Sequence, residues 1–538
     1  MNWLNHLILL PVVLPLLSGA ALVLFNERHH HLKFLINFIS TFIVLATACW
    51  LFHFTDTEGW PDGIGVYLAA NWAAPFGIVL LADRLAALML LLTAILATAA
   101  LVYSYSRWSR LGIHFHSLFQ FLLMGINGAF LTGDLFNLFV FFEVMLAASY
   151  GLVLHGYNVT RIRAGMQYIV VNLMSSFFFL IGIALIYAAS GTLNMADLAS
   201  RIAGLTDADR MLLETGIAIL AVAFLTKSAM WPLGFWLPTT YTAACPPVTA
   251  MLVLMTKIGV YIILRLWLLL FSDAAGDSAG FGGNVLLFGG MLTLAFGAIG
   301  LLASQESGRM AGYSAVISSG TLLAAVGYGQ PALISAALFY LLSSTLALAA
   351  FVLLIELIDR IRTPAASMLA LTMEAFAIDD ASKPESAGVA IPAAMAFLGL
   401  TFAACALIMA GLPPLSGFIA KFSIFATLLN ENNQQLHSPF SWVLLILIIV
   451  SGLAAIIALM RFGVRTFWST SAVPPRLQIT EAAPISVLLA LCVTMTIAAG
   501  PLHGYLQRVA ADLHQPQLYI DRVISSPVTT IASGEYTQ

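Results

Sequence analysis

The sequence predicts an all-α, polytopic membrane protein with about fourteen transmembrane helices, because its composition is strongly apolar and its apolar stretches have spanning length. Of the 538 residues, 61% are hydrophobic and only 9% are charged, and the mean hydropathy is +0.96. A water-soluble fold has too little interior to bury that much apolar surface. Stretches of about 20 residues, which cross about 30 Å of hydrocarbon as a helix, recur along the whole chain.

In order along the chain, spanning helices are predicted at residues 4–25, 32–54, 78–103, 114–132, 135–154, 166–189, 212–231, 248–271, 285–303, 310–328, 332–357, 393–411, 441–463 and 482–502. The first stretch is too long for the apolar core of a signal peptide and has no basic residue before it. We therefore expect it to be retained. We expect no soluble domain between these stretches.

The charge pattern and the motifs exclude several classes of function. The net charge is −3 and the 22 Lys and Arg residues are scattered singly, so there is no basic patch to follow nucleic-acid phosphates. We find no Walker loop, no GxGxxG after a strand, no HExxH and no CxxC. We therefore expect no nucleic-acid partner, no cofactor, no metal site and no covalent catalysis. The His29–His31 run is interpreted as a solvated interfacial cluster.

The short connections alternate in charge, which predicts the orientation in the membrane. The basic connections carry Arg28, Lys33, Arg107, Arg110, Arg161, Arg163, Arg309, Arg360, Arg362, Arg461, Arg465 and Arg476. The connections between them are acidic or neutral, as at Asp56, Glu58 and Asp62. Because basic loops stay in the cytoplasm, both termini are predicted to face away from it. The longest polar connection, 360–391, is then a cytoplasmic loop.

Two proline-rich stretches interrupt the helical pattern, KSAMWPLGFWLPTTYTAACPPV at 227–248 and AGLPPLSGFIAKF at 410–422. The prolines on which this prediction rests are Pro232, Pro238, Pro246, Pro413 and Pro414. Proline removes a backbone donor and clashes with the preceding turn, so each stretch is predicted to unwind into two half-helices. A pair of interrupted helices indicates an ion or substrate site. For 227–248, a simple connection between two helices stays an alternative.

Four ionisable residues lie inside apolar stretches: Glu143, Lys227, Lys257 and Lys421. A bare charge at the bilayer centre costs roughly 2.5 to more than 10 kcal/mol, so such residues are functional candidates by default. Lys257 has about nine apolar-stretch residues on either side, too many for its side chain to reach a headgroup. For Lys227 and Lys421 a headgroup contact stays possible.

These four side chains are suited to proton transfer. Burial disfavours the charged form of a lysine, and a nearby carboxylate favours it. Approach and separation of Glu143 and Lys227 would therefore load and unload a proton, so the pair is predicted to act as a switch.

Three segments resemble the signature segments of a known family: GDLFNLFVFFEV at 133–144, LTKSAMWPLGFWLPTTY at 225–241 and GLPPLSGFIAKF at 411–422. They are similar to the antiporter-like proteins shared by respiratory complex I and the Mrp cation/proton antiporters, and the order of apolar stretches agrees over nearly the whole chain. Within that family, TGDLFNLFVFFEVMLAASYGL and YAASGTLNMADLA resemble the branch formed by the D subunits of the Mrp antiporters.

The resemblance implies a fold of two inverted five-helix repeats, each with one discontinuous helix. It places three helices in 1–111, the first repeat in 112–271, the second repeat in 284–467, and the last helix with the C-terminal tail in 482–538.

The resemblance also implies a role for each interior charge. Glu143 and Lys227 would form the coupling ion pair of the first half, Lys257 would be the central proton relay, and Lys421 would be the terminal lysine in the second broken helix.

This sequence departs from the family in its second half. Many complex I relatives carry a histidine where this chain has Ser318 and Ser319, and often a His or Lys in the helix that here offers Tyr340 and Ser344. A proton path from Lys257 to Lys421 would therefore depend on hydroxyls and trapped water.

The sequence thus predicts a proton-translocating, multi-pass subunit of an Mrp-type antiporter in the bacterial inner membrane, exchanging H+ for Na+ or K+ together with other membrane subunits. It would be a secondary transporter subunit and not an enzyme. Two alternatives stay open: a proton-pumping membrane subunit of complex I or a related hydrogenase, and a scaffold with vestigial charges. The metal cation is expected to cross elsewhere, because no apolar stretch carries an Asp/Glu-rich oxygen cluster.

Overall fold

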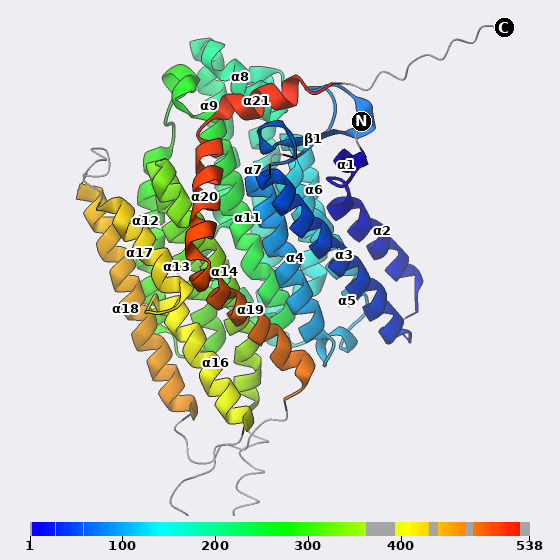
Figure 1. The fold of residues 1–538 in the computed structure, drawn as a ribbon, viewed down its shortest axis with the longest axis vertical. Coiled ribbons are helices and arrows are strands. Elements are labelled where there is room, and N and C mark those ends of the chain that lie inside the picture. Colours follow the sequence, from blue (N-terminus) through cyan, green and yellow to red (C-terminus); the bar gives the residue numbers. More distant parts are fainter. Residues whose placement is uncertain are drawn as a thin grey trace, which may run out of the picture.

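The fold is a bundle of long helices, as a computed structural model describes it for residues 3–26, 28–57, 59–361, 393–429, 439–467 and 477–527 (Figure 1). Its helices are α1 (Trp3–His6), α2 (Leu10–Leu24), α3 (His30–Asp56), α4 (Arg84–Ser104), α5 (Phe115–Leu131), α6 (Leu135–Val153), α7 (Val159–Ser190), α8 (Met195–Arg201), α9 (Asp207–Lys227), α10 (Trp236–Ala243), α11 (Pro246–Leu270), α12 (Gly283–Ala303), α13 (Ser307–Tyr328), α14 (Pro331–Ile361), α16 (Ala393–Ala410), α17 (Ser416–Leu428), α18 (Pro439–Phe467), α19 (Ile479–Ile497), α20 (Ala499–Leu513) and α21 (Pro516–Ile524). Two short strands, β1 (Gly65–Leu68) and β2 (Val79–Ala82), complete it.

The polytopic all-α fold is confirmed. Among the described residues, eleven helices are long and apolar enough to cross a membrane. Each predicted stretch contains a helix, but α2 and α5 are only 15 and 17 residues long. The exact number of crossings and the division into two inverted repeats stay predictions.

The prediction of helix from residue 78 is wrong at its start. Residues 79–82 form β2, which pairs antiparallel with β1 in a register that sets Gly65 opposite Ala82. An apolar run such as VLLA fits a buried strand as well as a helix, and hydropathy alone does not distinguish the two. Helix α4 begins only at Arg84, where the Asp83 carboxylate caps it by accepting from the Ala86 N–H at 2.8 Å.

The described chain begins at α1 and ends after α21 at one end of the bundle, the end that also holds β1 (Figure 1). The long helices alternate in direction, so the basic connections α2–α3, α4–α5 and α12–α13 share the opposite end. This arrangement agrees with the predicted alternation of charge, while the assignment of the basic end to the cytoplasm stays a prediction. Residues 362–392, which hold most of the predicted cytoplasmic loop, lie outside the described residues.

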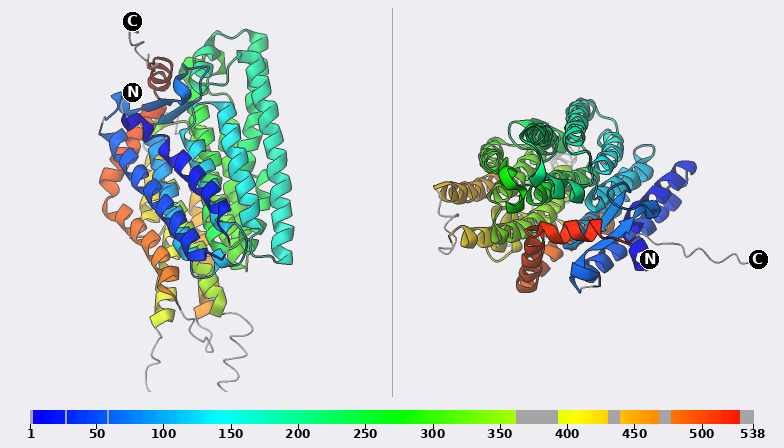
Figure 2. Two further views of the ribbon diagram at one scale, coloured as in Figure 1. Left: turned by 90° about the vertical axis from the view of Figure 1, so that its right-hand side faces the viewer. Right: turned by 90° about the horizontal axis from the view of Figure 1, so that it is seen from above.

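Helices α11 and α14 form the centre of the bundle, and nearly every residue of their apolar stretches is buried. Helix α14 packs against α11, α13, α16, α17, α19 and α20. The peripheral helices α7 and α18 instead expose apolar side chains such as Phe177 and Ile446, and Figure 2 shows these helices at the rim of the bundle. A side chain in the middle of α11 is therefore enclosed by other helices of the bundle.

Candidate functional site

The first broken helix is formed by α9 and α10. Helix α9 ends at Lys227, and α10 begins only at Trp236 after a short 3-10 turn at Leu233–Phe235. The intervening backbone turns sharply, with a positive φ of 59° at Ala229 and a cis peptide before Pro232. A side chain at Gly234 would approach the Ala229 carbonyl oxygen to 2.3 Å, so only glycine fits this turn.

Two of the predicted breaking prolines do not lie at this break. Pro238 is in the first turn of α10, and Pro246 is the first residue of α11. Backbone N–H groups in a first helical turn have no intrahelical partner, so proline is tolerated there. Pro238 thus belongs to the first turn of α10 and Pro246 begins α11, while their role in interrupting the helical pattern stays a prediction.

The second broken helix is formed by α16 and α17. Helix α16 ends at Ala410, Gly411 has a positive φ of 80°, and a cis peptide joins Pro413 to Pro414 before α17 begins at Ser416. The glycine that follows, Gly417, packs so closely that an added side-chain carbon would lie 1.9 Å from the Ile408 carbonyl oxygen. Both breaks thus close on a glycine that packs against the backbone.

Lys227, the last residue of α9, is buried and bonded inside the protein. Its side chain is 6% exposed, and Nζ donates to Asn172 Oδ1 on α7 at 2.5 Å. Asn172 is itself held by a bond from its Nδ2 to the Tyr168 carbonyl oxygen at 2.7 Å. Lys227 Nζ also lies 6.0 Å from the centre of the Phe142 ring. An interior acceptor and this degree of burial exclude a headgroup contact for Lys227.

Glu143, on α6, is half-buried, and its Oε1 is fully buried without a hydrogen-bond partner among the described residues. No ion pair joins it to Lys227 within the described part of the chain, so the expected pair is open in this structure. Lys227 does not pair with Glu143 here because its Nζ donates to the Asn172 amide oxygen instead. An unsatisfied buried polar atom costs about 1–3 kcal/mol, and more when it is charged, so this carboxylate is poised to gain a partner.

Lys257 lies at the centre of the bundle on α11, with no exposed surface. Its Nζ donates to Ser318 Oγ on α13 at 2.6 Å, and Ser318 shares a 2.9 Å hydrogen bond with Ser344 on α14. Of the hydroxyl residues predicted between Lys257 and Lys421, Ser318 thus bonds Lys257 directly and Ser344 is joined to it through Ser318. Ser319, also predicted, does not join them, since its Oγ is buried without a partner among the described residues.

Lys421 lies on α17 and reaches back across its own helix break. It is 7% exposed, and Nζ donates to the Ala410 carbonyl oxygen at the end of α16 at 2.9 Å. The carbonyl end of a helix carries partial negative charge, which suits an ammonium group. As for Lys227, burial and an interior acceptor exclude a headgroup contact.

A small cavity lies between Lys421 and the serines. The centre of a water molecule can occupy about 30 Å³ of it, and about 10–15 Å³ is enough for one water. The polar residues that line it are Ser314, Ser318, Tyr340, Ser343, Ser344, Lys421 and Ser451. The predicted hydroxyls Ser318, Tyr340 and Ser344 therefore share one cavity with Lys421, and Ser318 also contacts Lys257.

Three further buried polar residues, Asn172, Arg265 and Asp83, are not among those predicted from the sequence. Asn172 was recognisable as the amide within the apolar run YIVVNLM. Arg265 follows Lys257 by eight residues, which places both on the same face of α11. Its partner Asp83 accepts from Arg265 Nη2 at 2.8 Å through each carboxylate oxygen.

No group of three or more His, Cys, Asp or Glu residues in the described part of the chain is arranged to hold a metal ion. The buried groups are instead lysines, hydroxyls, an amide and one unpaired carboxylate. Such groups accept, hold and pass protons.

Comparisons with known proteins agree on one family. Residues 132–446 match the family model described as NADH:quinone oxidoreductase/Mrp antiporter, transmembrane region. The chain is 54% identical to the D subunit of a probable K(+)/H(+) antiporter of Rhizobium meliloti, with 98% of this chain and 99% of the relative covered. It is 32% identical to the D subunit of the Na(+)/H(+) antiporter of Alkalihalophilus pseudofirmus, with 97% and 99% covered.

Two solved structures have a similar fold. A chain of the Mrp complex from Dietzia sp. aligns with a TM-score of 0.81 at 25% identity, covering 97% of this chain and all of that one. A chain of respiratory complex I from Thermus thermophilus aligns with a TM-score of 0.72 at 20% identity, covering 95% and 99%. At that identity the likeness to complex I concerns the fold alone.

Proposed function

This chain belongs to the NADH:quinone oxidoreductase/Mrp antiporter family, and we propose that it is the D subunit of a multi-subunit antiporter that exchanges H+ for Na+ or K+ across a bacterial inner membrane. The likeness to curated D subunits over almost the full length of both chains supports this proposal. Other membrane subunits are its partners, and this chain carries protons.

The observation that carries the proton-transfer role is the set of three lysines buried in the bundle, each bonded to an interior acceptor. Lys227 and Lys421 adjoin the two helix breaks, and Lys257 lies on the central helix α11. Broken helices place ends of half-helices and free backbone groups at membrane depth, where they accommodate ions. The two breaks also support the proposal of two repeats.

In the proposed mechanism, Lys227 exchanges partners between Asn172 and Glu143. A neutral amide accepts from a lysine in either protonation state, whereas a carboxylate favours the charged lysine. Movement of Lys227 toward Glu143 would load a proton, and its return to Asn172 would release that proton toward Lys257. From Lys257 the proton passes through the Ser318 hydroxyl and the water of the cavity to Lys421.

Neutralising the carboxylate tests this function. In everted membrane vesicles that carry the intact complex, Glu143→Ala and Glu143→Gln should abolish cation-dependent proton flux while leaving assembly of the complex unchanged. Glu306, an exposed glutamate that pairs with Arg309 at the basic end, offers the matched control, and Glu306→Gln should transport normally. Normal flux in both Glu143 variants would favour the scaffold alternative.

A further inference from the structure

One face of α11 carries a line of three buried polar residues. Lys257, Tyr261 and Arg265 follow one another at intervals of four residues and are 0%, 2% and 5% exposed. Intervals of four keep side chains on the same helix face and span about 12 Å along the axis from Lys257 to Arg265. At its Arg265 end the line meets α21, where Tyr519 lies 5.6 Å from the guanidinium carbon; Figure 1 shows α21 at the end of the bundle that also holds β1.

Arg265 is held rigidly at the outer end of this line. Both oxygens of Asp83 accept from its Nη2, and its Nε donates to the Tyr261 hydroxyl at 3.0 Å. Tyr261 in turn donates to the carbonyl oxygen of Phe130, in the last turn of α5, at 2.7 Å. The ring of Tyr519 on α21 lies 5.6 Å from the guanidinium carbon. Four segments, among them the C-terminal helix α21, therefore enclose this one cation.

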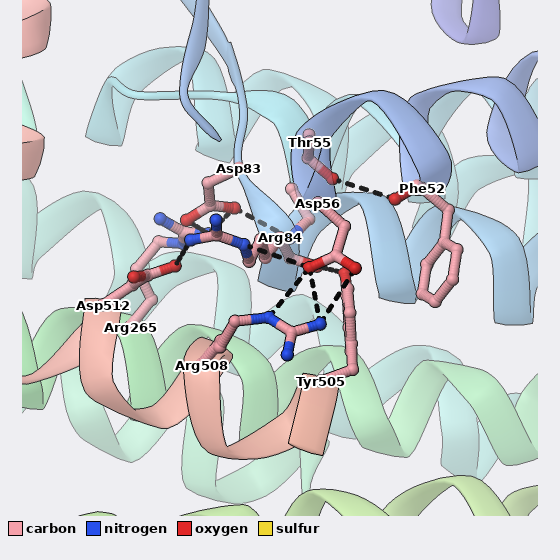
Figure 3. A network of polar contacts seen from close by, with 10 residues as sticks. Phe52, Thr55, Asp56, Asp83, Arg84, Arg265, Tyr505, Arg508 and Asp512 are labelled. Atoms are coloured by element: carbon pink, nitrogen blue, oxygen red, sulfur yellow. Dashed lines mark hydrogen bonds and ion pairs between the residues drawn. The ribbon is translucent and has the colours of Figure 1, made fainter. Parts of the chain in front are cut away.

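Beside Arg265, the neighbouring ion pairs are partly exposed. Arg84 bonds Asp512 at 2.6 Å, and Arg508 bonds Asp56 at 2.8 Å, with exposed fractions of the side chains between 11% and 50%. Figure 3 shows these pairs beside Asp83 and Arg265. The Asp83–Arg265 pair thus adjoins a partly solvated network, and Arg265 follows the buried Lys257 by about two helical turns on α11.

We propose that Arg265, fixed by Asp83, is an electrostatic seal that stops protons from leaking between Lys257 and the end of the bundle that holds β1 and α21. An arginine keeps its positive charge at all physiological pH values. A fixed cation in a narrow passage excludes protons and other cations. This inference rests on the proposed role of Lys257 as a proton carrier.

The hydrogen bonds favour a seal over a proton wire. Lys257 donates to Ser318, and the Tyr261 hydroxyl is engaged by Phe130 and Arg265. Within the described part of the chain, no hydrogen bond joins Lys257 to Tyr261. A chain of hydrogen bonds along this face of α11 is therefore broken between these two residues. The Asp83 carboxylate is also fully engaged and is not available to take up a proton, since its Oδ1 accepts from the Ala86 N–H as well as from Arg265.

The test is passive proton entry into liposomes that contain the intact complex, driven by a pH step without Na+ or K+ and with a permeant organic cation to balance charge. Arg265→Gln should raise the entry rate several-fold. Arg265→Lys, which keeps the charge, should stay as tight as the unmodified complex. Arg84→Gln removes a charge at the same end of the bundle but outside the line on α11, and it should not leak.

Two further variants separate a seal from a structural ion pair and from failure of the proposed function. Asp83→Asn breaks the pair but leaves the cation, so it should remain tight, whereas a purely structural pair would leak equally in Asp83→Asn and Arg265→Gln. The double variant Arg265→Gln with Lys257→Ala should lose the leak. A tight Arg265→Gln complex, or a leak that persists in the double variant, would overturn the seal. Because the assay contains no transported metal ion, its result is independent of whether the complex performs antiport.

Discussion

The two broken helices hold their lysines in different ways. Lys227 precedes its break and bonds the side chain of Asn172 on another helix, α7. Lys421 follows its break and bonds the backbone carbonyl of Ala410, the last residue of the preceding half-helix. Lys227 can exchange the side-chain amide of Asn172 for another acceptor, because that amide lies on a neighbouring helix. Lys421 is held by a backbone carbonyl at its own helix break and has no such alternative. The first half is therefore built for a lysine that changes partner, and the second for one that stays in place.

The surroundings of the two lysines differ in the same direction. Near Lys227, the rings of Phe142, Phe179 and Phe224 pack together, and the Glu143 carboxylate has a free oxygen among the described residues. Near Lys421, serine hydroxyls line a cavity with room for water. Charges act on one another strongly in dry surroundings and weakly where water is present. The first half thus depends on charge, and the second on hydroxyls and water.

The largest effect is expected at Lys257, which joins the two regions. Lys257→Ala removes the amine bonded to Ser318, so protons from the first half no longer reach the cavity. Cation-dependent proton flux in everted vesicles should fall to the background of vesicles without the complex, with assembly unchanged. Full activity in this variant would place the relay elsewhere, on the hydroxyls alone.

The next largest effect concerns the breaks themselves. Gly417→Ala and Gly234→Ala force a methyl group against a backbone carbonyl, at 1.9 Å and 2.3 Å before any relaxation. Overpacking typically costs about 1–3 kcal/mol, and backbone atoms yield less than side chains. Thermal unfolding of the purified complex should show a larger loss for Gly417→Ala than for Gly234→Ala. Gly399→Ala, where an added methyl has nothing within 4 Å, is the control. Equal stability of all three variants would show that the breaks are not closely packed.

A smaller, partial effect is expected at Asn172. Asn172→Leu leaves Lys227 with Glu143 as its remaining acceptor and should lock the pair in its closed state. Because an unsatisfied buried polar group costs about 1–3 kcal/mol, we expect antiport to slow by about tenfold. Asn172→Asp adds a second carboxylate at the same place and should slow exchange as well. Wild-type rates in both variants would rule out partner exchange at Lys227.

The smallest effect should distinguish two adjacent serines. Ser318→Ala removes the hydroxyl between Lys257 and Ser344, but cavity water can substitute for part of the path, so flux should fall about fivefold, the equivalent of about 1 kcal/mol for one hydrogen bond. Ser319→Ala is the matched control, because its Oγ has no partner among the described residues. If the two variants behave alike, the second half does not conduct through Ser318.

Much of this protein was determined by the sequence alone. Hydropathy located the spanning stretches, Pro232 and the Pro413–Pro414 pair indicated the two breaks, and four charges in apolar stretches indicated the site. Each of these inferences depends on a local cost, either the transfer of a charge into hydrocarbon or the loss of a backbone donor at proline. The same reasoning failed at residues 79–82, because a short apolar run has the same transfer energy in a strand as in a helix.

Only the tertiary structure decided which groups these charges meet. Asn172 lies 55 residues from Lys227, Ser318 lies 61 residues from Lys257, and Asp83 lies 182 residues from Arg265. The sequence indicated Glu143 as the partner of Lys227, yet the packing of α7 against α9 supplies an amide and leaves the carboxylate open. A charged side chain inside the membrane needs a hydrogen-bond or ion-pair partner, and the sequence shows which residues have this need. Which neighbour satisfies it depends on how distant helices pack.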